Sequence, residues 1–101
     1  MNDNDEKLVG EKAVGDMYLA AAMLAYGATL KRVDRSDPKR QKFIFIPTTL
    51  PSMVISSNDV IVTTKLCPTL DDVETYFVGR RLWLPPSYPD SVKSIKSAIH
   101  S

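Results

Sequence analysis

The chain is poor in the residue types on which most small catalytic and metal sites depend. Its 101 residues include one cysteine and one histidine. A lone cysteine excludes an internal disulfide bond, and with a single histidine it leaves no spacing typical of a zinc site. Because disulfide-free chains are typical of reducing compartments, we expect a cytoplasmic protein.

Glycine is also scarce, with four residues that are never adjacent. A phosphate-binding loop needs several glycines within a few positions, so no nucleotide-binding loop is predicted. Long apolar runs are missing too, because the longest one, residues 19–26, is too short to span a bilayer. The polar N-terminus lacks the apolar stretch of a secretory signal. We predict no cofactor and no membrane contact.

What is present fits one folded domain. Hydrophobic residues make up 44% of the chain and charged residues 25%, which is ordinary for a globular protein. The net charge is only +1, but residues 3–16 are mostly acidic and residues 31–42 mostly basic. We expect a flexible acidic tail over residues 1–12 and a single domain over residues 13–101.

The first helix is the clearest local prediction. Residues 17–26 are rich in alanine, leucine and methionine, and their apolar side chains recur at helical spacing. Asp16 precedes them as an N-cap, because its carboxylate can accept free backbone N–H groups. Gly27 follows at the position where a left-handed backbone is common.

Two hairpins follow this helix. Residues 28–33 and 42–46 favour strands and flank a stretch rich in turn formers, which predicts an antiparallel hairpin with a basic tip. Both faces of residues 43–46 are apolar, so this strand should be central in its sheet. Residues 53–56 and 60–64 predict a second hairpin, and the pattern leaves open whether it joins the same sheet.

Capping patterns mark two further helices. Thr69 and Asp72 have the spacing of a capping box, and Gly79 is placed to end that helix. Ser87 and Asp90 repeat the spacing before a last helix with an apolar stripe.

Together these elements predict the α+β class. We expect an antiparallel sheet of two hairpins with about three helices packed on it. An additional short strand over residues 82–84 is an option that the pattern leaves open.

No group of residues predicts catalysis. Cys67 and His100 could form a nucleophile and base, but neither lies in a recognisable motif, and Cys67 is expected to pack as a small apolar residue. Asp71, Asp72 and Glu74 form an acidic cluster, which complements the dipole at a helix start. Neighbouring helix positions diverge by about 100°, so Asp71 and Asp72 cannot easily face one metal ion. We predict that the protein is not an enzyme.

Basic side chains gather at the turn of the first hairpin. These candidate nucleic-acid contacts are Arg35, Lys39, Arg40 and Lys42. Such a tip can contact the phosphates of DNA or RNA without reading sequence, whereas the plain alternative is a solvated turn. A second basic pair, Arg80 and Arg81, lies near Trp83, and a basic pair beside an aromatic ring is compatible with stacking on exposed bases.

Leu82, Trp83 and Leu84 form a short apolar stretch that we interpret as a candidate interface. A tryptophan between two leucines is more typical of a core or an interface than of a base-stacking platform. A short hairpin also offers an unpaired strand edge. Both features favour binding of another protein or of a second copy of this chain.

The pattern of several segments resembles a group of short, uncharacterised proteins of phages, prophages and related mobile elements, which share a domain of unknown function. The early residues that carry the resemblance are Asp16, Met17, Tyr18, Leu19, Ala20, Ala21, Leu24, Gly27, Leu30, Phe43, Ile44 and Phe45. The late residues are Glu74, Tyr76, Phe77, Tyr88, Ile95, Lys96 and Ser97. Residues 47–68 depart from the pattern and look like an insertion. The resemblance implies a mobile-element origin and no catalysis, and it supplies no site residues.

We therefore predict a small accessory protein of a phage or mobile element that acts by binding in the host cytoplasm. The first hypothesis is nucleic-acid binding through the basic tip together with Arg80 and Arg81. The second is a protein-interaction module, either a homodimer or a binder of a host or phage protein. An enzyme that uses Cys67 or the acidic cluster is the third.

Overall fold

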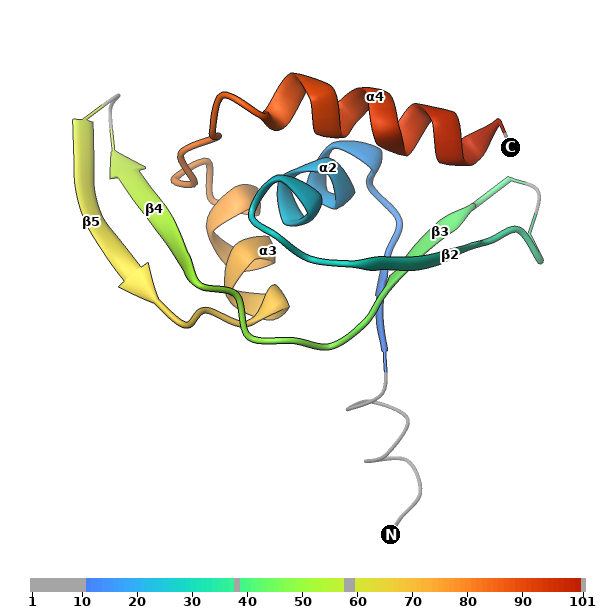
Figure 1. Cartoon of the computed structure of the whole chain (residues 1–101), viewed down its shortest axis with the longest axis horizontal. Helices are drawn as coiled ribbons and strands as arrows, with labels where there is room; N and C mark the ends of the chain where they lie inside the picture. Colours follow the sequence, from blue (N-terminus) through green and yellow to red (C-terminus); the bar gives the residue numbers. More distant parts are fainter. Residues whose placement is uncertain (1–10, 38, 58–59, 101) are drawn as a thin grey trace, which may run out of the picture.

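The computed structural model of the chain describes residues 11–37, 39–57 and 60–100. Along this part of the chain a short strand and a helix are followed by four strands and then by two helices (Figure 1). The elements are β1 (Lys12–Val14), α2 (Met17–Ala25), β2 (Leu30–Asp34), β3 (Lys42–Phe45), β4 (Ser52–Ser57), β5 (Val60–Leu66), α3 (Leu70–Val78) and α4 (Tyr88–Ile99). The predicted α+β class and both hairpins are confirmed.

One sheet has the strand order β1-β3-β2, with both pairs antiparallel. β3 is central, as its two apolar faces predict, and it buries Phe43, Ile44 and Phe45. Val14 on one side and Val33 on the other are both paired with Phe43. Strand β3 is therefore paired on both sides, whereas β2 is an edge strand of this sheet.

β1 was not predicted from the sequence. We expected Glu11 and Lys12 in the acidic tail. Lys12 is instead the first residue of this strand, and Glu11 directly precedes it. The strand is three residues long and carries no apolar alternation, so its order comes from pairing with β3. The remainder of the predicted tail, residues 1–10, lies outside the described residues.

The second hairpin forms a separate two-stranded sheet, β4-β5. The other edge of β4 is covered by residues 81–83, where the backbone N–H of Ser56 donates to the Arg81 carbonyl at 2.6 Å and that of Trp83 donates to the Val54 carbonyl at 2.9 Å. The optional strand over residues 82–84 is thus reduced to a single bridge between Leu82 and Ile55.

The helix boundaries follow the predicted caps at α2 and α3. The Asp16 carboxylate accepts the backbone N–H groups of Tyr18 and Leu19, and Gly27 has a φ of 110°. Thr69 and Asp72 form the full capping box, each side chain accepting the other residue's backbone N–H. These caps need only residues within a few positions, which is why the sequence reveals them.

The cap of α4 differs from the prediction. Ser87 has helical backbone angles, with φ −77° and ψ −5°, and its side chain makes no capping hydrogen bond. An N-cap side chain reaches the first-turn N–H groups from an extended backbone, so the helical geometry of Ser87 prevents the bond. Cys67 was also predicted wrongly, because it is exposed and has a φ of 53°.

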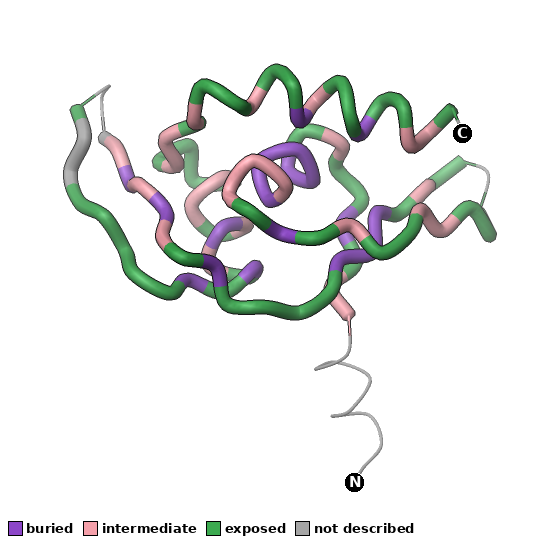
Figure 2. The backbone as a smooth tube through the Cα atoms, viewed as in Figure 1, coloured by how far each residue is buried: buried purple, intermediate pink, exposed green. Residues whose placement is uncertain are grey.

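One core cluster joins residues of both sheets with residues of α2, α3 and α4. Figure 2 shows the buried positions concentrated on α2, which packs against α4, α3 and β1. Leu50, Met53 and Ile55 are also buried in this cluster. Residues 47–68, expected to be an insertion, therefore supply part of the core.

Candidate functional site

Three of the predicted basic side chains line one hollow beside the tip of the first hairpin. Lys39, Arg40 and Lys42 border a cavity of about 530 Å³, which we call the basic hollow. Its other lining residues are Gly15, Met17, Gln41, Phe43 and Ile99. The hollow therefore lies where the hairpin meets the start of α2 and the end of α4, a junction that the sequence alone could not reveal.

Short-range hydrogen bonds shape the hairpin tip. The Asp34 carboxylate accepts the backbone N–H of Ser36 at 2.9 Å and its hydroxyl at 2.7 Å. The Asp37 carboxylate accepts the backbone N–H of Lys39 at 3.0 Å. The Ser36 bonds lower the pKa of Asp34, and the charges of Arg32 and Lys42 lower it further. The acidic residues of the tip are thus occupied in holding the turn.

The side chain of Arg35 has hydrogen-bond partners in another element of the fold. Its guanidinium donates to the backbone carbonyls of Ala98 at 2.6 Å and Ile99 at 2.8 Å, at the end of α4. A cation there satisfies free carbonyls and complements the negative end of the helix dipole. Arg35 therefore ties the hairpin to the last helix, and this role leaves fewer of its donors for a ligand.

The remaining cations of the hairpin differ in how their charge is balanced. Glu11 pairs with Lys31 at 2.8 Å and with Arg32 at 3.0 Å, and these bonds lower the pKa of Glu11 to about 2. In the described part of the chain, no carboxylate lies within ion-pair distance of the exposed Lys39 and Arg40 side chains. Lys39 and Arg40 at the tip therefore have no ion pair within the described residues, whereas Lys31 and Arg32 at the base of the hairpin share Glu11.

The second basic pair lies elsewhere. Arg80 and Arg81 follow α3, and neither of them lines the basic hollow. The Arg81 guanidinium stands over the Tyr76 ring, 5.7 Å from its centre. The two predicted groups of cations thus do not form one continuous patch.

The apolar stretch next to this pair is partly buried. Leu82 packs against the core cluster, Trp83 is half-buried, and Leu84 is exposed. The backbone carbonyl of Trp83 accepts a hydrogen bond from the Tyr26 hydroxyl. The stretch therefore runs as a strap along β4, and Leu84 is the most exposed of its three side chains.

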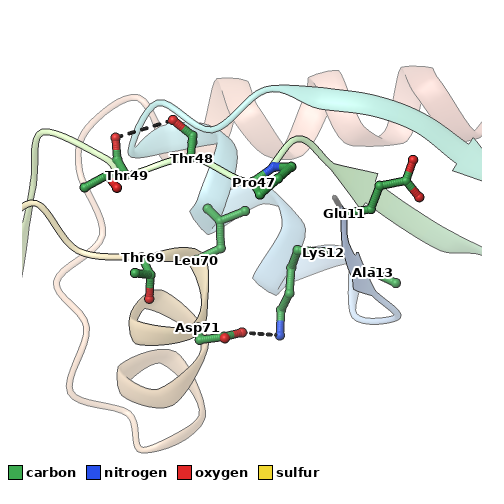
Figure 3. A pocket seen from close by; sticks show the side chains of 9 residues that line it. All are labelled: Glu11, Lys12, Ala13, Pro47, Thr48, Thr49, Thr69, Leu70 and Asp71. Carbon is green, nitrogen blue, oxygen red and sulfur yellow. Dashed lines mark hydrogen bonds and ion pairs between the residues drawn. The ribbon is translucent and has the colours of Figure 1, made fainter. Parts of the chain in front are cut away.

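A further cleft lies between β1, residues 47–49 and the start of α3 (Figure 3), with a volume of about 780 Å³. Lys12 reaches across it to Asp71 at 2.7 Å and also pairs with Glu74 at 2.5 Å. These carboxylates raise the pKa of Lys12, although its partial burial acts in the opposite direction. The sequence analysis missed this cleft, because Lys12 and Asp71 are 59 positions apart. Its charged lining residues are all engaged in ion pairs, and three threonines complete its polar lining.

The residues considered for catalysis are not brought together. Cys67 follows β5 and His100 follows α4, at well-separated places in Figure 1. Among the residues that the structure describes, no cluster of three histidine, cysteine or acidic side chains could hold a metal ion. None of the helices in the described ranges is long and apolar enough to cross a membrane.

Comparison with known proteins matches the chain to no family model, no curated protein and no solved structure. The function must therefore be argued from the geometry of the chain itself.

Proposed function

We propose that the protein is a small accessory protein without enzymatic activity, of phage or mobile-element origin, that binds the phosphate backbone of nucleic acid at the basic hollow. The observation that carries this proposal is the hollow bordered by Lys39, Arg40 and Lys42. In the described structure, the first two of these have no carboxylate within ion-pair distance. Uncompensated cations around a concave surface favour a polyanion.

The apolar part of the hollow fits this role. Met17, Phe43 and Ile99 line it together with the side chains of the tip. Low-dielectric walls strengthen the field of the cations at the opening. Because the chain has a net charge of only +1, binding depends on this local field instead of on the charge of the whole molecule.

Fluorescence anisotropy of labelled duplex and single-stranded DNA, at ~50 and ~200 mM salt, tests the proposal. Three phosphate contacts predict a slope of about −2.7 in log K against log salt for a duplex, or an affinity loss of about 40-fold across that range. An absence of binding at the lower salt concentration would contradict the proposal.

A pair of double variants sharpens the test. Lys39→Glu with Arg40→Glu should abolish binding and leave the fold intact, because both side chains are exposed. Lys65→Glu with Lys93→Glu changes the net charge equally at two other exposed positions and should leave most of the binding. Equal losses in both variants would show that only the net charge matters.

The part of Arg80 and Arg81 in nucleic-acid binding can be tested with duplexes of different length. Because neither of them lines the basic hollow, a short duplex seated there is not expected to contact them. We expect Arg80→Glu with Arg81→Glu to weaken binding of a long duplex more than binding of a short one. Equal effects on both lengths would remove these two residues from the nucleic-acid contact.

A further inference from the structure

A second hollow lies at the C-terminal end of α3, and we call it the α3 hollow. Its volume is about 540 Å³, within the range of about 300–1,000 Å³ that is usual for binding clefts. The lining residues are Asp16, Phe77, Val78, Arg80, Leu82 and Leu84. Val78 is 70% exposed and Leu84 is 38% exposed. Large apolar side chains left in water around a hollow are typical of an interaction surface.

The backbone at Arg80 is unusual for an arginine. After α3, the Arg80 N–H donates to the Phe77 carbonyl at 3.0 Å and the Arg81 N–H to the Tyr76 carbonyl at 2.9 Å. This pattern is a Schellman motif, which favours glycine at its left-handed position. Arg80 occupies that position with a φ of 60°, whereas Gly79 has a φ of −76°. The chain thus places an arginine where helix termination alone would favour glycine, which suggests that its side chain has a function.

The free charge at the rim of the α3 hollow is positive. In the described part of the chain, the Arg80 guanidinium has no hydrogen bond or ion pair, whereas its neighbour Arg81 lies over the Tyr76 ring. Asp16 is the other charged residue of the lining, and its carboxylate already accepts two backbone N–H groups of α2. The helix start balances the charge of Asp16, and Arg80 stays available for an anion.

We propose that the α3 hollow docks a segment of a partner protein that carries a large apolar side chain next to an aspartate or glutamate. The apolar side chain would contact Phe77, Val78 and Leu84, and the carboxylate would pair with Arg80. Nucleic acid fits this hollow less well than the basic one, because most of its lining is apolar and Arg80 is its one cation. The two hollows share no lining residue, although Asp16 of one lies between Gly15 and Met17 of the other in the sequence. The inference does not require nucleic-acid binding.

Selection of a displayed library of random 12-residue peptides on the immobilised full chain tests this inference. We expect enriched peptides to carry a large apolar residue beside an acidic one. Arg80→Gly is the decisive variant, because it removes the guanidinium and relieves the backbone. Its melting temperature should rise by about 4–8 °C, and its affinity for the enriched peptides should fall at least about 10-fold. Loss of binding in this variant therefore cannot be attributed to unfolding.

A matched pair of surface variants separates docking from general stickiness. Val78→Ser should weaken peptide binding, whereas Leu66→Ser, at a side chain on β5 that is 73% exposed, should leave it within about twofold. Three results would overturn the inference: no enrichment, enriched peptides without acidic residues, or equal binding by Arg80→Gly. Light scattering that detects a dimer lost in Val78→Ser would also overturn it, in favour of a second copy as the occupant.

Discussion

The two hairpins are built from similar strand-forming residues but hold very different places in the fold. β3 lies between two strands and buries three consecutive side chains. β5 pairs with β4 alone in the described structure, and its described side chains, at positions 60 and 63–66, are all exposed. The difference shows that neighbouring strands and helices, and not strand propensity, decide which strand enters the core.

This difference also decides what each hairpin can offer to a ligand. In the first hairpin β3 is paired on both sides and β2 on one, and the basic hollow opens beside the tip. The second hairpin offers the outer edge of β5, which no described element pairs with. Function is therefore expected at the turn of the first hairpin and beside the strap that holds the second.

The largest expected effect contrasts a buried residue of the first hairpin with an exposed residue of the second. Phe45→Ala should lower the free energy of unfolding by about 3–5 kcal/mol, because it leaves a cavity at a fully buried position. Leu66→Ala should change it by less than about 0.5 kcal/mol, since the side chain is mostly in water. Urea denaturation measures both free energies of unfolding. A comparable loss in the two variants would show that Leu66 is buried against another part of the protein.

An intermediate effect is expected where the second hairpin is attached to α2. The Tyr26 hydroxyl donates to the Trp83 carbonyl and accepts the Val54 N–H at 3.4 Å. Burial raises the pKa of Tyr26 above its ordinary value. Tyr26→Phe should cost about 1–3 kcal/mol, because it leaves two partly buried backbone groups without a partner.

Hydrogen exchange gives this prediction its local readout. In Tyr26→Phe, the amides of β4 should exchange faster while those of β3 change little. Tyr18→Phe is the control, because Tyr18 is 51% exposed, and it should leave both strands unchanged. Faster exchange over the whole molecule would mean that Tyr26 supports the core instead of the second hairpin alone.

The smallest effect concerns acid stability of the first sheet. Glu11, which precedes β1, pairs across β3 with Lys31 and Arg32 of β2. The bonds to Arg32 and Lys31 lower its pKa from 4.5 to about 2. A carboxyl whose pKa falls on folding stabilises the protein above its unfolded value and loses that contribution as the pH falls through the folded value. The stabilisation from Glu11 should therefore disappear between about pH 4.5 and pH 2.

Unfolding of Glu11→Gln at several pH values measures this contribution. The variant should be slightly less stable than the original protein at pH 7 and should match it near pH 2. High salt should reduce the difference at pH 7, since the pair is at the surface. A difference that is the same at all pH values would show that the charge of Glu11 has no part in it.

Local patterns explain most of what could be predicted from the sequence. The caps at Asp16 and Thr69 and the central place of β3 were correct, because each depends on residues close in sequence or on continuous apolar character. β1 could not be found, because Lys12–Val14 gains its order from a strand about thirty positions later. The left-handed residue after α3 could not be found either, because Arg80 and not Gly79 adopts that conformation.

The sequence shows which basic residues the candidate site contains, but not how they are arranged. The basic residues of the tip are visible in the sequence, and three of them do border one hollow. The distinct role of Arg35 is not visible, because its carbonyl partners lie more than sixty positions away. The α3 hollow also depends on tertiary packing, which brings Asp16 beside Val78 and Leu84.

The bond from Arg35 to the end of α4 places a constraint on the order of folding. The carbonyls of Ala98 and Ile99 belong to the last residues of the helix, and their donor is 63 and 64 positions earlier in the chain. During synthesis, Arg35 is made long before these carbonyls exist, so the first hairpin must wait for the last turn of α4 to close this contact. Contacts of such separation slow folding, and here they join the first hairpin to the last helix.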